Sequence, residues 1–157
     1  MAKRHPSLIS LSHDHHHGLA LALRLRQGNN ALLNDGWTHD RGEQARRVLK
    51  FYQEELSVHF RLEEEVLFPA MMEHVAHASS LIAALIAQHR TMEKLIDRLR
   101  GSELLSPDQT LMELGEILKQ HIRAEERDLF PAFERDMPRE VAGETLRLLQ
   151  QRRNESS

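Results

Sequence analysis

Cysteine is absent from the 157-residue sequence, which excludes disulfide bonds, thiolate zinc sites, iron–sulfur clusters and cysteine nucleophiles. No run approaches the roughly 18 apolar residues of a membrane span, and no apolar segment of about 7 to 15 residues follows the first basic residues, as in a secretory signal. We therefore expect a cytoplasmic protein with no membrane partner. With 21 basic and 24 acidic side chains the net charge is −3, so nucleic acid is not an expected partner either.

The composition favours helices throughout. β-Branched residues are sparse, there is one tryptophan and one tyrosine, and Leu, Ala, Glu, Arg and Gln dominate long stretches. Glycine, proline and asparagine mark the loops between four main helices. We expect these helices before Gly28, over about residues 43–74, before Gly101, and over about residues 107–136. A short fifth helix is expected after Pro138, followed by a frayed tail from Arg152.

The length predicts a simple organisation. At roughly 100 to 200 residues per domain, 157 residues make one domain. We expect this domain to span residues 1–157, with a core over residues 8–135 and a C-terminal helix and tail over residues 138–157. The fold class is therefore all-α, and we expect the four helices to form an up-down-up-down bundle.

The sequence contains an internal repeat. Residues 59–70, HFRLEEEVLFPA, and residues 121–132, HIRAEERDLFPA, agree at eight of twelve positions, and a weaker match relates the first predicted helix to the third. Two helical hairpins thus look like copies of each other. The shared prolines, Pro69 and Pro131, should kink or end their helices. The repeated His-x-x-x-Glu pairs are His59 with Glu63 and His121 with Glu125.

Helical spacing places these polar side chains on buried faces. Apolar residues at three- and four-residue intervals put His89 in the buried seam of the third helix, and the same pattern selects His15 in the first. His16 lies one residue off that seam and is the main rival. The four-residue spacing in each His-x-x-x-Glu pair directs both side chains to one face. Since the histidines reach similar heights in an up-and-down bundle, the sequence predicts one cluster of six polar groups.

A buried cluster of this kind requires cations, because an unpaired buried carboxylate costs on the order of several kcal/mol. Four imidazoles and two carboxylates without a thiolate suit iron, manganese or zinc better than copper(I). If both glutamates and an oxide or hydroxide bridge two six-coordinate metals, about one position per metal stays open. Dioxygen, peroxide or nitric oxide could bind there.

The pattern H…HxxxE…H…HxxxE, with Leu-Phe-Pro after each pair, resembles the signature of hemerythrin-like, or HHE cation-binding, domains over about residues 8–135. The resemblance implies a four-helix bundle with a non-haem di-iron centre. The donor set itself would also accept zinc or manganese in place of iron. It also implies roles in binding, sensing or storing O2, or in responses to iron, nitric oxide or peroxide. The implied metal ligands are His15, His59, Glu63, His89, His121 and Glu125.

The sequence departs from oxygen-carrying hemerythrins at two positions. Those carriers have a second histidine four residues after the third-helix histidine, where this chain has Glu93. Their last carboxylate lies five residues after its histidine, where this chain has Glu126. Glu93 and Glu126 are therefore further candidate ligands. Because a carboxylate makes iron harder and more easily oxidised than an imidazole does, reversible oxygen carriage is not expected.

Three functions remain open from the sequence. The leading hypothesis is a protein, monomer or homodimer, that binds or senses a diatomic or peroxide ligand, or iron, without enzymatic turnover. The second is a di-iron peroxidase or oxidase, for which only Tyr52 and Glu93 offer acid–base groups, although we favour a packing role for Tyr52. The third is a zinc-filled helical interaction module. No protein partner is identified.

Overall fold

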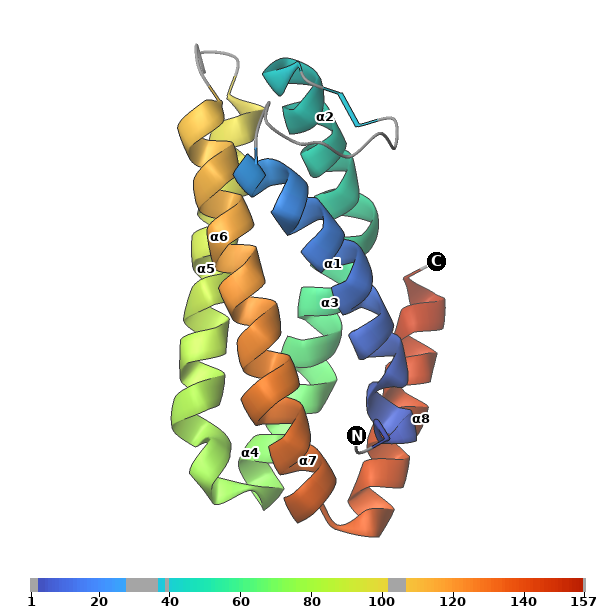
Figure 1. Ribbon diagram of the computed structural model, residues 1–157. Coiled ribbons are helices and arrows are strands. Elements are labelled where there is room, and N and C mark those ends of the chain that lie inside the picture. Colours follow the sequence, from blue (N-terminus) through green and yellow to red (C-terminus); the bar gives the residue numbers. More distant parts are fainter. Residues whose placement is uncertain (1–2, 28–36, 39, 102–106, 157) are drawn as a thin grey trace.

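The computed structural model describes residues 3–27, 37–38, 40–101 and 107–156, and within them all regular secondary structure is helical. Four long helical segments lie side by side and alternate in direction (Figure 1), which confirms the predicted up-down-up-down bundle. The first segment is a 3-10 turn, η1 (Pro6–Leu8), that leads into α1 (Ile9–Gln27). The third is α5 (Ser79–Arg100), after the 3-10 turn η5 (Ala76–Ala78).

The second and fourth segments alternate between α-helical and π-helical turns. The second consists of α2 (Arg41–Phe51), the π-helical η3 (Tyr52–Leu56), α3 (Ser57–Leu62), the π-helical η4 (Glu63–Leu67) and α4 (Phe68–His74). The fourth consists of α6 (Asp108–Ala124), the π-helical η6 (Glu125–Leu129) and α7 (Phe130–Asp136). Single π-helical turns within α-helices are frequent at functional sites.

Each shared proline follows a π-helical turn, with one phenylalanine between the turn and the proline. A proline has no N–H to donate, and its ring clashes with the carbonyl four residues back in a regular helix. In η4 the N–H of Phe68 instead donates to the carbonyl of Glu63, five residues back, so the turn is wide where Pro69 follows. η6 precedes Pro131 in the same way. Neither proline ends its helix, because the widened turn accommodates the ring.

Two apolar clusters occupy the two halves of the bundle. One contains Phe68, Phe130 and Phe133, and the other contains Phe60, Met92 and Leu118. α1 and α5 pass from one cluster to the other near His15 and His89. A layer of buried polar side chains therefore separates the two halves of the core.

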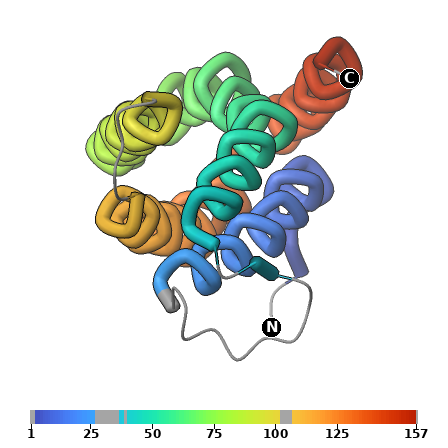
Figure 2. Tube along the Cα trace, turned by 90° about the horizontal axis from the view of Figure 1, so that it is seen from above, coloured from blue at the N-terminus to red at the C-terminus, as the bar shows by residue number. Residues whose placement is uncertain are grey.

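The C-terminal helix, α8 (Arg139–Glu155), packs against the outside of the bundle, where it contacts η1, α3 and η4 (Figures 1 and 2). It buries Ala142, Thr145 and Leu149. The expected fifth helix is therefore present, but it is long and continues through residues that we expected to be frayed. None of the helices in the described residues is long and apolar enough to cross a membrane.

Candidate metal centre

The structure brings all six predicted ligands into one buried layer. They come from α1, α3, η4, α5, α6 and η6, and both glutamates are the first residues of π-helical turns. Their exposed fractions are His15 4%, His59 3%, Glu63 0%, His89 0%, His121 1% and Glu125 0%. The side chains are thus shielded from water and must find their polar partners within the protein.

The six side chains form two overlapping groups, and within each group one ligand atom per residue lies within 4.8 Å of the others. His15 and His59 belong to the first group, which we call position A. His89 and His121 belong to the second, position B. Glu63 and Glu125 belong to both groups. Two shared carboxylates and two imidazoles per position is the arrangement expected of a pair of bridged cations.

Each histidine is oriented by a hydrogen bond from its Nδ1 atom to an oxygen outside the cluster. The pairs are His15–Glu126 (2.9 Å), His59–Asp14 (2.8 Å), His89–Glu64 (2.7 Å) and His121–Gln88 (2.8 Å). Because these oxygens can only accept, the hydrogen resides on Nδ1 and the lone pair of each ring on Nε2. All four Nε2 atoms then face the cluster as potential metal donors.

On the inner side of the cluster, acceptor atoms face one another or are buried without a hydrogen-bond partner. The Nε2 atoms of His89 and His121 lie 3.1 Å apart, and both carry lone pairs in the orientation set by their Nδ1 bonds. His59 Nε2, Glu63 Oε2 and Glu125 Oε2 are buried without a hydrogen-bond partner. Buried acceptors that face one another are unfavourable unless a proton or cation lies between them. The donor set therefore fits a pair of cations.

The charges in the cluster favour bound positive charge. Burial lowers the pKa of His59, but Glu63 and hydrogen bonds to carboxylates outweigh it and hold this pKa well above its ordinary value of 6.5. The pKa values of His15 and His89 are raised in the same way, against burial. Burial raises the pKa of Glu63, yet His59 and hydrogen bonds bring it well below 4.5. Without a metal, the cluster would therefore hold protons in its place.

A family model of the hemerythrin HHE cation-binding domain matches residues 7–133. The chain belongs to the hemerythrin HHE cation-binding family. No curated protein and no solved structure is significantly similar to the chain. The C-terminal helix α8 of this hemerythrin-family chain lies outside the matched segment.

The alternative ligands of this hemerythrin-family cluster lie outside it. His16 is exposed, and Glu93 forms an ion pair of 2.6 Å with Arg90 on the surface of α5. Glu126 faces Nδ1 of His15, so in this structure it orients the imidazole and does not join the Nε2 atoms that face the cluster. None of these three side chains belongs to either group of potential metal ligands among the described residues.

Tyr52 is separated from the cluster by Phe60. Its ring meets the edge of Phe60 at a centroid distance of 6.5 Å, and the guanidinium of Arg100 lies 5.6 Å from the Tyr52 ring centroid. Phe60 in turn stacks on His89 at 3.9 Å. The structure therefore gives Tyr52 the packing role that we favoured from the sequence.

The sequence analysis did not identify the outer hydrogen-bond partners Asp14, Glu64 and Gln88. The repeat carries a signal for all of them. Glu64 and Glu126 each follow a ligand glutamate, and Asp14 and Gln88 each precede a ligand histidine in the weaker match. The duplication thus preserves the positions that orient the imidazoles as well as the imidazoles themselves.

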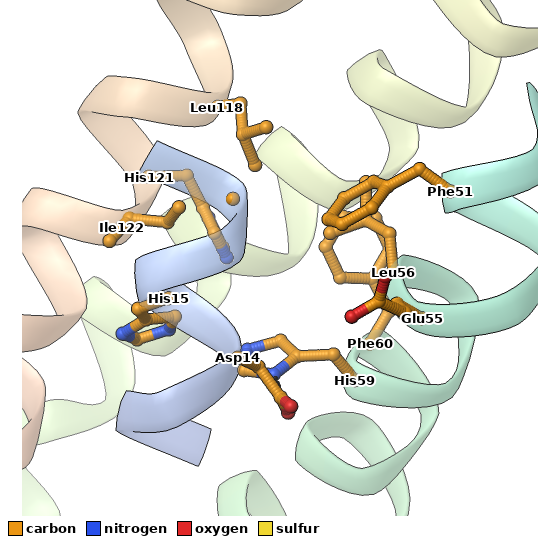
Figure 3. Close-up of a pocket in the computed structure, with 11 residues that line it drawn as sticks. Asp14, His15, Phe51, Glu55, Leu56, His59, Phe60, Leu118, His121 and Ile122 are labelled. Carbon is orange, nitrogen blue, oxygen red and sulfur yellow. Dashed lines mark hydrogen bonds and ion pairs between the residues drawn. The ribbon is translucent and has the colours of Figure 1, made fainter. Parts of the chain in front are cut away.

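A narrow cavity reaches position A of the hemerythrin-family cluster (Figure 3). The imidazoles of His15, His59 and His121 line it together with apolar side chains that include Phe60, Leu118 and Ile122. The space open to the centre of a water molecule is about 10 Å³, which is close to the minimum for a single water. The cavity can therefore hold about one molecule of that size without displacement of the side chains that line it.

Proposed function

We propose that this chain is a non-haem di-iron protein that binds or senses a small ligand such as O2, nitric oxide or peroxide. One observation carries the proposal: two adjacent cation positions share two carboxylates, and a cavity of about one water's size adjoins one of them. Iron bound there would supply an open coordination position and a change of oxidation state. We also propose a cytoplasmic location and a monomer or homodimer, as the sequence suggested.

The side chains of this chain would hold the two irons and orient them. Two imidazole nitrogens and one oxygen from each of Glu63 and Glu125 give each position four protein donors. Six-coordinate iron then has coordination positions left for small ligands. Four protein donors would also close a tetrahedral structural zinc site. The cavity beside position A, and not the number of donors, therefore supports ligand binding over a purely structural role.

The cavity supports a small, uncharged ligand. Phe60, Leu118 and Ile122 give it an apolar wall, and its histidines have their Nδ1 hydrogens already engaged. An anionic metabolite would lose its hydration there and would face the carboxylates of Asp14 and Glu55, which also line the cavity. A diatomic gas or peroxide meets the limits on both size and polarity.

The test is metal analysis followed by ligand spectroscopy. Full-length protein purified without oxygen should contain about two irons per chain, and nitric oxide, O2 or peroxide should each be tested for a change in the iron spectra. A variant carrying both Glu63→Ala and Glu125→Ala is the control and should lose the iron and the response. Protein that binds no iron, or iron that none of these ligands perturbs, would contradict the proposal. Sustained turnover of hydrogen peroxide would instead indicate a peroxidase.

A further inference from the structure

The outer hydrogen bonds of the cluster follow the internal repeat. Glu64 and Glu126 occupy equivalent positions, and each reaches a histidine of the neighbouring hairpin. Asp14 and Gln88 are also equivalent, and each reaches the histidine of its own hairpin's second helix. The four bonds therefore relate positions A and B by an approximate twofold arrangement.

One pair of equivalent residues departs from this approximate twofold arrangement. Asp14 offers a carboxylate to His59, whereas the equivalent Gln88 offers a neutral amide oxygen to His121. At position A both imidazoles therefore donate to carboxylates, and at position B only His89 does. A carboxylate acceptor raises the basicity of a ligand imidazole and fixes its orientation, and charge-assisted hydrogen bonds are about twice as strong as neutral ones.

Asp14 is held by a residue that has no counterpart in the repeat. Arg153 of α8 contacts both carboxylate oxygens, with Nη2 at 2.8 Å from Oδ2 and Nη1 at 3.4 Å from Oδ1. The same Oδ2 accepts the hydrogen of His59. A two-point contact from a planar guanidinium fixes the orientation of a carboxylate better than a single contact does.

Arginines also contact the other two outer carboxylates. Arg4 lies 3.4 Å from Glu126, and Arg90 pairs with Glu64. Gln88 has no charge for an arginine to pair with. Positions A and B thus differ in the carboxylate of Asp14 and in its partner Arg153. Arg153 lies on α8, outside residues 7–133 of the family match.

We propose that the two cation positions are inequivalent: position A binds a divalent ion more tightly than position B, and Arg153 supports this difference by positioning Asp14. The inference rests on the proposed metal centre. Removal of an outer partner of a ligand histidine typically lowers metal affinity by about 10- to 100-fold. We therefore expect the two stepwise affinities to differ by about that factor.

The experiment is a Zn²⁺ titration of metal-free, full-length protein against a competing chelator, with anomalous diffraction to assign the occupied position at one equivalent. The first ion should occupy position A. Asp14→Asn, which reproduces the amide of Gln88, should weaken the first step by about 10- to 100-fold and bring the two positions close to equal occupancy. Arg153→Gln should weaken position A to a smaller extent and leave position B unchanged, and Arg153→Lys should restore part of the loss.

The matched control is Arg152→Gln, the neighbouring residue of α8, whose side chain pairs with Glu65 at 3.2 Å. It should leave both steps unchanged. Equal occupancy in the unaltered protein, preferential filling of position B, or no selective loss at position A in Asp14→Asn would overturn the inference. If Asp14→Asn failed to fold, Arg153→Gln, a substitution at the protein surface, would still test whether position A is weakened selectively. Failure to bind any Zn²⁺ would instead refute the metal centre itself.

Discussion

Gly18 controls the width of the cavity beside position A, which makes Gly18→Ala an informative perturbation. A Cβ atom at residue 18 would lie 2.7 Å from Cδ1 of Ile122 and 4.0 Å from Cδ1 of Leu118. Carbon atoms in contact are normally about 3.5 to 4.0 Å apart, so the methyl group of Ile122 must move by about 1 Å. Gly18, Ile122 and Leu118 all line the cavity. The displaced methyl group therefore takes up space that a ligand needs.

The size of the effect follows from the small volume available. About 10 Å³ is open to the centre of a water molecule, so the methyl group and a ligand cannot both occupy the cavity without further strain. Overpacking of this kind costs about 1 to 3 kcal/mol, which corresponds to a decrease of about 5- to 150-fold in ligand association. In the ligand-free protein, the gain of about 1 kcal/mol from alanine in a helix offsets part of the strain, so we expect a net loss of about 0 to 2 kcal/mol in unfolding free energy.

The assay is rapid mixing of the reduced, iron-loaded protein with nitric oxide, alongside metal analysis. Gly18→Ala should retain about two irons per chain and bind the ligand more slowly. Gly115→Ala is the control, since a Cβ there would meet the carbonyl oxygen of Ala22 at 3.0 Å and Gly115 does not line the cavity. It should lower stability and leave ligand association unchanged. Unchanged association in Gly18→Ala, or equal slowing in both variants, would refute this account of the cavity.

Three other perturbations test the cluster and α8. Glu125→Ala should weaken both cation positions because its carboxylate belongs to both groups, whereas His89→Ala should weaken position B alone; Zn²⁺ stoichiometry separates the two outcomes. The pKa of His59 is raised above 6.5, so the free energy of unfolding of the metal-free protein should fall as the pH rises from about 6.5 through that pKa. Metal affinity should rise over the same range, because protons that compete with the metal leave the cluster. Urea denaturation and metal titrations at several pH values would show these opposite slopes. Gly143→Ala in α8 meets no atom within 4 Å and should raise the unfolding free energy by about 0.5 to 1 kcal/mol, so a loss in urea denaturation would contradict the packing of α8.

The faces of the long helices could be predicted because they depend on local periodicity. Apolar residues at three- and four-residue intervals identified His15 over His16, and the structure buries the first and exposes the second. The helix ends were close for a similar reason: the second segment was expected over 43–74 and spans 41–74, and the fourth was expected over 107–136 and spans 108–136. Loop-forming residues in the sequence mark these helix ends directly.

Features that depend on contacts between helices could not be predicted. The pair of Asp14 and His59 joins residues 45 positions apart, and it exists only because α1 and α3 lie at one particular register. α8 is held by tertiary burial of Ala142, Thr145 and Leu149 more than by any local signal. The continuation of the helix through Pro69 also depends on contacts between helices. A proline ends an isolated helix, but it is tolerated where packing on both sides keeps the widened turn in place.

The polar layer has a consequence for how folding and metal binding are coupled. It interrupts the core between two apolar clusters, so each half of the bundle buries its own side chains whether or not a cation is present. The layer alone is unfavourable, because His59, Glu63 and Glu125 present buried atoms without hydrogen-bond partners. Cations remove that penalty only in the folded state, so each bound ion adds its binding free energy to stability, about 4 kcal/mol at 1,000 times its Kd. If position A binds more tightly, the first ion provides most of this gain, and the second position remains the more exchangeable of the two.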